Sequence, residues 1–125
     1  MKRSSDTHAA ECERLVPILI PAIREVARTC GYALGVHGSL RYDIDLIAVP
    51  WGPMSMSQMH VAERIIQCIA GIRTSKVDPP SQKPYGRLAW SIHLGGGPYV
   101  DLSVMPRPED LTAAKKTDKR KKRNG

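Results

Sequence analysis

Apolar positions along the chain change their spacing several times, and each spacing predicts a helix or a strand. Residues 18–30 have apolar side chains at helical intervals, and Pro17 indicates that this helix begins near residue 18. A second helix is predicted to begin at a capping box formed by Ser55 and Gln58 and to end at Gly71. Alternating or β-branched apolar residues predict four strands, at 32–36, 43–49, 87–94 and 99–104.

The order of these elements predicts an α+β fold, a small mixed sheet with two helices packed on one face. Three prolines in the loop 73–86 predict no regular structure in its later part, and the glycine-rich segment 94–98 predicts a hairpin turn. The length predicts one domain over residues 1–110, and composition predicts a basic, disordered tail over 111–125.

The tail carries most of the formal net charge of +7. It is predicted either to attract nucleic acid without sequence preference or only to keep the chain end soluble. The three cysteines form no Cys-x-x-Cys pair and no zinc-like grouping with histidine, so free thiols are expected. A polar N-terminus and the lack of a membrane-length apolar run predict a cytoplasmic protein with no membrane partner.

Two carboxylates interrupt an apolar run at the start of the second predicted strand. Alternation places Asp43 and Asp45 on one face and Ile44 and Leu46 on the other, and Asp101 has the same setting in the last strand. If the helices cover the apolar face, the three carboxylates project together from the open face and repel one another unless a cation binds. Oxygen ligands suit Mg²⁺ or Mn²⁺, which predicts a metal site, although D-x-D is a common pattern and solvated surface carboxylates are the alternative.

The segments GVHGSLRYDIDLIAV and YVDLSVMP resemble the DNA polymerase β-like nucleotidyltransferase superfamily, in particular its minimal single-domain members. They are also similar to small bacteriophage proteins, a likeness that implies no activity. The family resemblance implies that Gly38 and Ser39 hold the phosphates of a nucleoside triphosphate. It further implies that Asp43, Asp45 and Asp101 hold two metal ions for nucleotidyl transfer, with Asp101 taking the proton of the attacking hydroxyl.

The chain departs from the family pattern at one place. Only residues 40–42 separate the Gly-Ser pair from Asp43, whereas the family usually has a turn or two of helix there. Phosphate is therefore expected on the backbone N–H groups of a tight turn or on Arg41, with Lys83 and Arg87 as further phosphate partners.

Three hypotheses about function follow. The first is a nucleotidyltransferase with an unidentified acceptor, whose binding surface a protein partner or a second copy of the chain supplies. The second is a catalytically degenerate member that binds a nucleotide or a protein as a regulator, which the short loop and the single domain favour. The third is a nucleic-acid-binding module that uses the basic tail.

Overall fold

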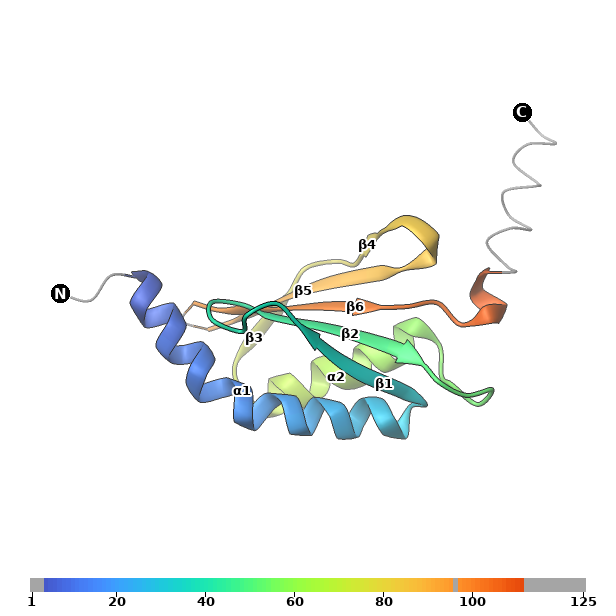
Figure 1. Cartoon of the computed structure of the whole chain (residues 1–125), viewed down its shortest axis with the longest axis horizontal. Coiled ribbons are helices and arrows are strands. Elements are labelled where there is room, and N and C mark those ends of the chain that lie inside the picture. Colours follow the sequence, from blue (N-terminus) through green and yellow to red (C-terminus); the bar gives the residue numbers. More distant parts are fainter. Residues whose placement is uncertain (1–3, 96, 112–125) are drawn as a thin grey trace, which may run out of the picture.

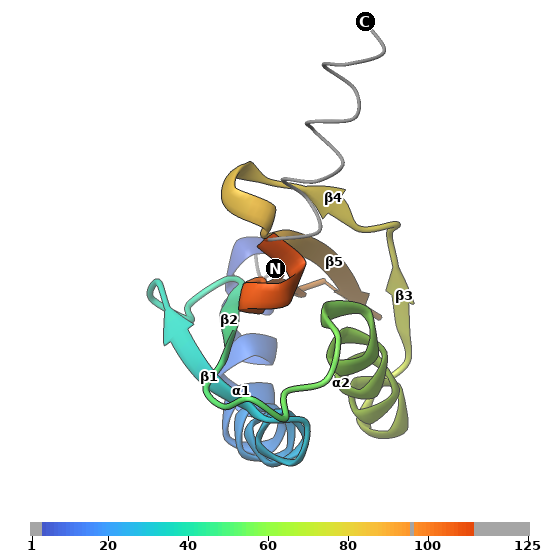
Figure 2. The same ribbon diagram turned by 90° about the vertical axis from the view of Figure 1, so that its right-hand side faces the viewer.

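The computed structural model describes residues 4–95 and 97–111, and in this part of the chain two α-helices lie on one face of a six-stranded mixed sheet (Figure 1). In chain order the elements are α1 (Ser4–Thr29), β1 (Tyr32–His37), β2 (Ile44–Pro50), α2 (Gln58–Ile72), β3 (Ser75–Val77), β4 (Ser81–Gln82), the 3₁₀-helix η1 (Pro84–Gly86), β5 (Leu88–Leu94) and β6 (Tyr99–Val104). Figure 2 shows α1 and α2 together below the sheet, with β4 on the opposite side. The predicted α+β class is confirmed.

The strands lie in the order β1-β2-β6-β5-β3, and β4 pairs with β5 beside that path. Among these strands β2 and β6 pair in parallel, and the other pairs are antiparallel. The four predicted strands are all present, with ends shifted by at most one residue. The predicted hairpin turn joins β5 to β6, and the backbone N–H of Leu94 donates to the carbonyl of Pro98 at 3.0 Å.

The loop between α2 and β5 is more regular than predicted. β3 forms before the prolines and pairs with β5, and β4 fits between Pro80 and Pro84. The prediction was wrong in its later part because prolines exclude a long central strand but not a short pairing at the edge of a sheet. Pro84 itself begins η1, where its missing N–H is not needed.

Helix α1 begins at Ser4, well before the predicted start near residue 18. Pro17 and Pro21 both lie inside the helix, each removing one hydrogen-bond donor, and Figure 1 shows α1 bent along its length. A buried apolar stripe continues across both prolines and offsets their cost. Its members are Cys12, Leu15, Leu19, Ile23 and Ala27. The N-terminal half of α1 reaches the loop before β2, where the Cys12 thiol donates to the Tyr42 carbonyl at 2.8 Å.

The predicted capping box of α2 is also wrong. Ser57 is the N-cap, and its Oγ accepts a hydrogen bond from the His60 N–H at 3.1 Å. Ser55 is buried instead, with its Oγ 2.8 Å from the carbonyl oxygens of Gly31 and Gly52. The Gln58 amide reaches across to the carbonyls of η1 and β6. The helix continues one residue beyond the predicted stop at Gly71.

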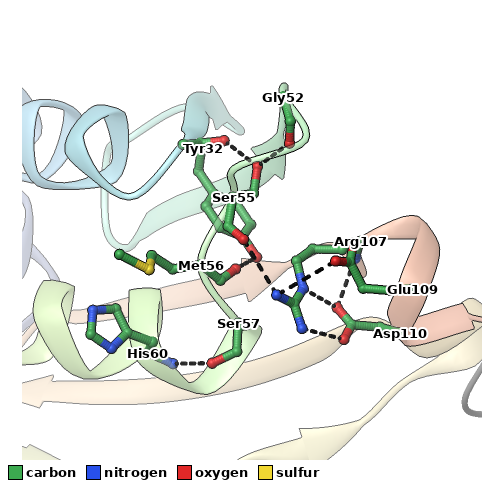
Figure 3. A network of polar contacts seen from close by, with 10 residues as sticks. Tyr32, Gly52, Ser55, Met56, Ser57, His60, Arg107, Glu109 and Asp110 are labelled. Carbon is green, nitrogen blue, oxygen red and sulfur yellow. Dashed lines mark hydrogen bonds and ion pairs between the residues drawn. The ribbon is translucent and has the colours of Figure 1, made fainter.

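A polar network ties the segment after β6 to the loop between β2 and α2 (Figure 3). The Arg107 guanidinium donates to both Asp110 carboxylate oxygens, at 3.1 and 2.9 Å, and to the Ser55 carbonyl at 3.3 Å. These bonds lower the pKa of Asp110. The Tyr32 hydroxyl donates to the Met56 carbonyl at 2.7 Å, and burial raises the pKa of Tyr32 to about 12.

The predicted basic tail lies outside the described residues, apart from Leu111. The cysteines are free thiols, as expected, with Cys12 and Cys30 buried and Cys68 partly buried. Within the described residues no helix is both long and apolar enough to cross a membrane.

Candidate functional site

Strands β2 and β6 present one covered face and one open face. The covered face consists of fully buried residues under the helices, including Ile44, Leu46 and Leu102 at 0% exposure. Asp45 and Asp101 lie directly opposite each other in the parallel register and point to the other side, where both are partly buried. Alternation therefore places these two carboxylates as predicted, side by side at the beginning of two neighbouring strands.

The third predicted carboxylate, Asp43, acts electrostatically on Tyr99 of β6, as Asp45 and Asp101 do. The pKa of the Tyr99 hydroxyl is raised chiefly by the negative charge of Asp43, and further by burial and by the charges of Asp101 and Asp45. The strand register places Asp45 beside Asp101, and Asp43 precedes Asp45 by two residues at the start of β2, so all three charges act on Tyr99 from this end of the two strands. We call these three residues the carboxylate cluster.

The carboxylate cluster has no cationic partner in the described part of the chain. No ion pair within 4.0 Å joins Asp43, Asp45 or Asp101 to a lysine, arginine or histidine of residues 4–95 and 97–111. The same residues contain no group of three or more His, Cys, Asp and Glu side chains arranged as a ready-made metal site. The three carboxylates are of the chemical type that Mg²⁺ prefers, but their side chains as placed in the structure do not form a group that could hold a metal ion.

Gly38 lies against the carboxylate cluster. Its φ is +77°, and a Cβ at this position would stand 2.8 Å from Asp45 Oδ2. Glycine is needed here for two reasons, the left-handed backbone and the close approach of a carboxylate oxygen. The short connection after it contains no helix, and Leu40 also has a positive φ of 57°.

Ser39 and Arg41 face a different surface from the one predicted. They line a cleft of about 580 Å³ together with Glu13 and other residues of α1, and the carboxylate cluster is not among its lining residues. Ser39 Oγ accepts the Arg41 N–H at 3.2 Å, and the Arg41 guanidinium lies 5.4 Å from the centre of the Tyr42 ring. Of the predicted phosphate-holding pair, Gly38 is therefore at the carboxylates, whereas Ser39 points toward α1.

Arg87 lies further along the open face. Its Nη1 donates to Ser103 Oγ at 2.7 Å, and Ser103 follows Asp101 by two positions on the same side of β6. Lys83 is exposed and shares with Arg87 a cleft of about 390 Å³ beside η1. The two predicted phosphate partners are thus near each other, but only Arg87 is placed next to the carboxylate cluster.

The structure adds residues that sequence reasoning did not assign to the site. Tyr99 shares a strand face with Asp101, a placement that alternation alone supports. His93 lies opposite Tyr99 across β5 and β6, with ring centres 6.0 Å apart, and His93 Nε2 is 2.8 Å from Asp78 Oδ2. Asp78 carried no sequence signal because β3, which positions it, was not predicted. Cys12 is also close, since the charge of Asp43 contributes to raising its thiol pKa after burial.

No protein-family model matches this chain, and a comparison with curated proteins gives no match either. The resemblance to nucleotidyltransferases therefore stays a prediction that rests on the three short motifs.

Proposed function

We propose that this protein binds a nucleoside triphosphate together with a divalent cation at the carboxylate cluster, and that it is a nucleotidyltransferase-like protein. The observation that carries the proposal is that Asp45 and Asp101 lie side by side in the parallel register of β2 and β6, with Asp43 two residues before Asp45. None of the three carboxylates lies within 4.0 Å of a cationic side chain of the described residues. Three neighbouring carboxylates repel one another at neutral pH, and a cation from solution relieves that repulsion. An oxygen-only donor set favours Mg²⁺ or Mn²⁺, which keep positions for water and phosphate.

The roles of the residues follow from their placement. Asp43, Asp45 and Asp101 hold the cation, which supplies neutralisation of phosphate charge and activation of an attacking hydroxyl. Gly38 lets the backbone approach the phosphates without a Cβ in the way. In a transfer reaction Asp101 accepts the proton of the acceptor hydroxyl. Arg87, whose Nη1 donates to Ser103 Oγ two residues after Asp101, provides positive charge for the phosphates.

A second candidate function is binding without transfer, as in a nucleotide-sensing or protein-binding regulator. The observation that favours it is the connection between β1 and β2, which has no helix whose N-terminus holds phosphate. Ser39 and Arg41 line the cleft against α1, which leaves fewer groups at the carboxylates than a transferase of this kind uses. The nucleic-acid alternative rests on the tail beyond residue 111, which the structure does not describe.

We place the protein in the cytoplasm as part of the same proposal. Its buried cysteines, Cys12 and Cys30, are free, and buried free thiols suit a reducing compartment.

Isothermal titration calorimetry of the whole chain with each nucleoside triphosphate, with and without Mg²⁺, tests the proposal. We expect Mg²⁺-dependent binding by the wild type and none by the double variant Asp43→Ala/Asp45→Ala. Glu63→Ala is the matched control, because Glu63 is an exposed carboxylate on α2 and its loss should leave binding unchanged.

Three results are informative. No Mg²⁺-dependent binding by the wild type refutes the proposal. Binding with release of pyrophosphate from labelled nucleotide, tested with RNA and protein acceptors, supports the transferase. Binding without turnover supports the regulator.

A further inference from the structure

An apolar groove lies on the same open face as the carboxylate cluster. Its lining residues include Ile47 and Val49 of β2, Met105 after β6, Tyr85 of η1, and Pro108 and Leu111 of the following segment. We call it the apolar groove; its volume is about 780 Å³, within the range of small-molecule sites. The side chains that line it are apolar apart from the Tyr85 hydroxyl. Figure 1 shows the turn at 84–86 and the segment 107–111 on the side of the sheet away from the helices.

Two of these side chains are far more exposed than apolar residues of a small domain usually need to be. Tyr85 is 87% exposed. Val49 is 41% exposed although its strand, β2, is an interior strand of the sheet, between β1 and β6. The turn that carries Tyr85 is nevertheless anchored, because the Gln58 amide donates to the Gly86 carbonyl at 2.9 Å and the Lys83 N–H donates to the Arg87 carbonyl at 2.8 Å. The ring is therefore held on a packed turn with its surface open to a ligand.

The groove and the carboxylate cluster are joined by the two parallel strands. Asp45, Ile47 and Val49 follow one another on the open side of β2, and at about 3.3 Å per residue the groove begins about 7 Å from Asp45. On β6 the sequence of open-face positions is Asp101, then Ser103, then Met105 beyond the strand end. One continuous surface thus runs from the carboxylates to the groove.

Arg87 brings a cation to this surface at Ser103. Arg87 donates to Ser103 Oγ at 2.7 Å and takes part in no ion pair with the described residues. The surface therefore presents, in order, carboxylates for a metal ion, a guanidinium for an anion, and an apolar groove with an aromatic side chain. A nucleotide has matching parts, namely cation-bound phosphates at one end and a planar base at the other.

We infer that the apolar groove receives the base of the nucleotide, with the ring of Tyr85 against it and Arg87 at the phosphates. This inference rests on the proposed function, because it needs the phosphates at the carboxylate cluster. Apolar walls recognise the face of a base and not its hydrogen-bonding edge, so the site prefers purines to pyrimidines and discriminates little between adenine and guanine.

The test compares ATP, GTP and UTP with inorganic tripolyphosphate, each with Mg²⁺, by calorimetry on the whole chain. The wild type should bind ATP and GTP at least about tenfold more tightly than tripolyphosphate, since stacking on one aromatic side chain has effects of this size. Tyr85→Ala and Val49→Glu should each remove about tenfold of the ATP affinity and leave tripolyphosphate binding nearly unchanged. Tyr85→Phe should bind ATP like the wild type.

Met54→Ala is the matched control, because Met54 is also 87% exposed but does not line the groove. Equal affinity for ATP and tripolyphosphate, or ATP binding that neither groove variant changes, overturns the inference and leaves the proposed function intact. Failure of both ligands to bind with Mg²⁺ overturns the proposed function as well. A wild-type dimer in analytical ultracentrifugation that Val49→Glu converts to monomer assigns the groove to a second copy of the chain and also overturns the inference.

Discussion

Gly38→Ala should destabilise the protein and at the same time disturb the carboxylate cluster. The backbone at Gly38 has φ of +77°, and an L-residue in this left-handed region costs about 1–2 kcal/mol. The new Cβ would also stand 2.8 Å from Asp45 Oδ2, so the carboxylate must shift. Restricting the unfolded chain gives back about 0.4–1 kcal/mol. The two backbone effects leave a net loss of about 0–1.6 kcal/mol, and the displaced carboxylate adds to it, so we expect a loss of about 1 kcal/mol or more, which lowers Tm by roughly 4 °C or more.

Thermal unfolding followed by circular dichroism measures the effect, and a double-mutant cycle separates its two causes. In the Asp45→Ala background the contact with Oδ2 is gone, so Gly38→Ala should cost less than in the wild type, and the difference reports the contact. Gly52→Ala is the control, because a Cβ at Gly52 meets nothing within 4 Å and its φ is not positive. A Gly38→Ala variant no less stable than Gly52→Ala would contradict both the left-handed backbone and the approach to Asp45.

Three further predictions concern other parts of the molecule. Gly71→Ala should raise the free energy of unfolding, measured in urea, by about 0.5–1 kcal/mol, because Gly71 is inside α2 and a Cβ there meets nothing within 4 Å. A loss of stability would show that the last helical turn needs glycine. The bonds with Arg107 lower the pKa of Asp110 in the folded protein. The ionised carboxylate therefore stabilises the fold at pH values above the ordinary aspartate pKa of about 3.9, and this contribution is lost as the pH falls through the lowered pKa of the folded state. Asp110→Asn should therefore lower the urea midpoint at pH 7 and much less near pH 2, and an equal loss at both would refute the assignment. Asp43→Asn should lower the pKa of Tyr99, because the charge of Asp43 is the main cause of its raised pKa. The absorbance of tyrosinate during a pH titration, compared with that of Tyr99→Phe, measures this pKa. An unchanged Tyr99 titration would show that Asp43 does not act on Tyr99.

The strands were predictable because the sheet is covered on one face only. Alternating or β-branched apolar residues located all four long strands within one residue at each end, and alternation placed Asp45 and Asp101 on the open face. The start of α1 was not predictable from local rules, since a proline normally ends or begins a helix. Packing of the apolar stripe across Pro17 outweighs that local preference.

Contacts between distant segments decided the remaining differences. Ser55 has the right spacing to Gln58 for a capping box, but its hydroxyl is engaged by carbonyls at Gly31 and Gly52, one of them distant in the sequence. The groove beside the carboxylates likewise depends on Tyr85, which a turn between β4 and β5 brings over β2. Patterns within one strand contain no information about such contacts, so sequence reasoning located the carboxylates and not the apolar groove beside them.

The charges on the open face are arranged in a way that favours a ligand over a structural role. The Arg87 guanidinium reaches Ser103, the open-face residue that follows Asp101 on β6, and forms no ion pair with the described residues, while the carboxylates also have no cationic partner there. A fold that used these groups for its own stability would bring the opposite charges into contact, as Arg107 and Asp110 do in the segment after β6. Because the acids and the guanidinium are held apart on neighbouring positions, a ligand that supplies both a cation and an anion satisfies both at once. Metal-bound polyphosphate has this combination, and the adjoining apolar groove extends the match to the base.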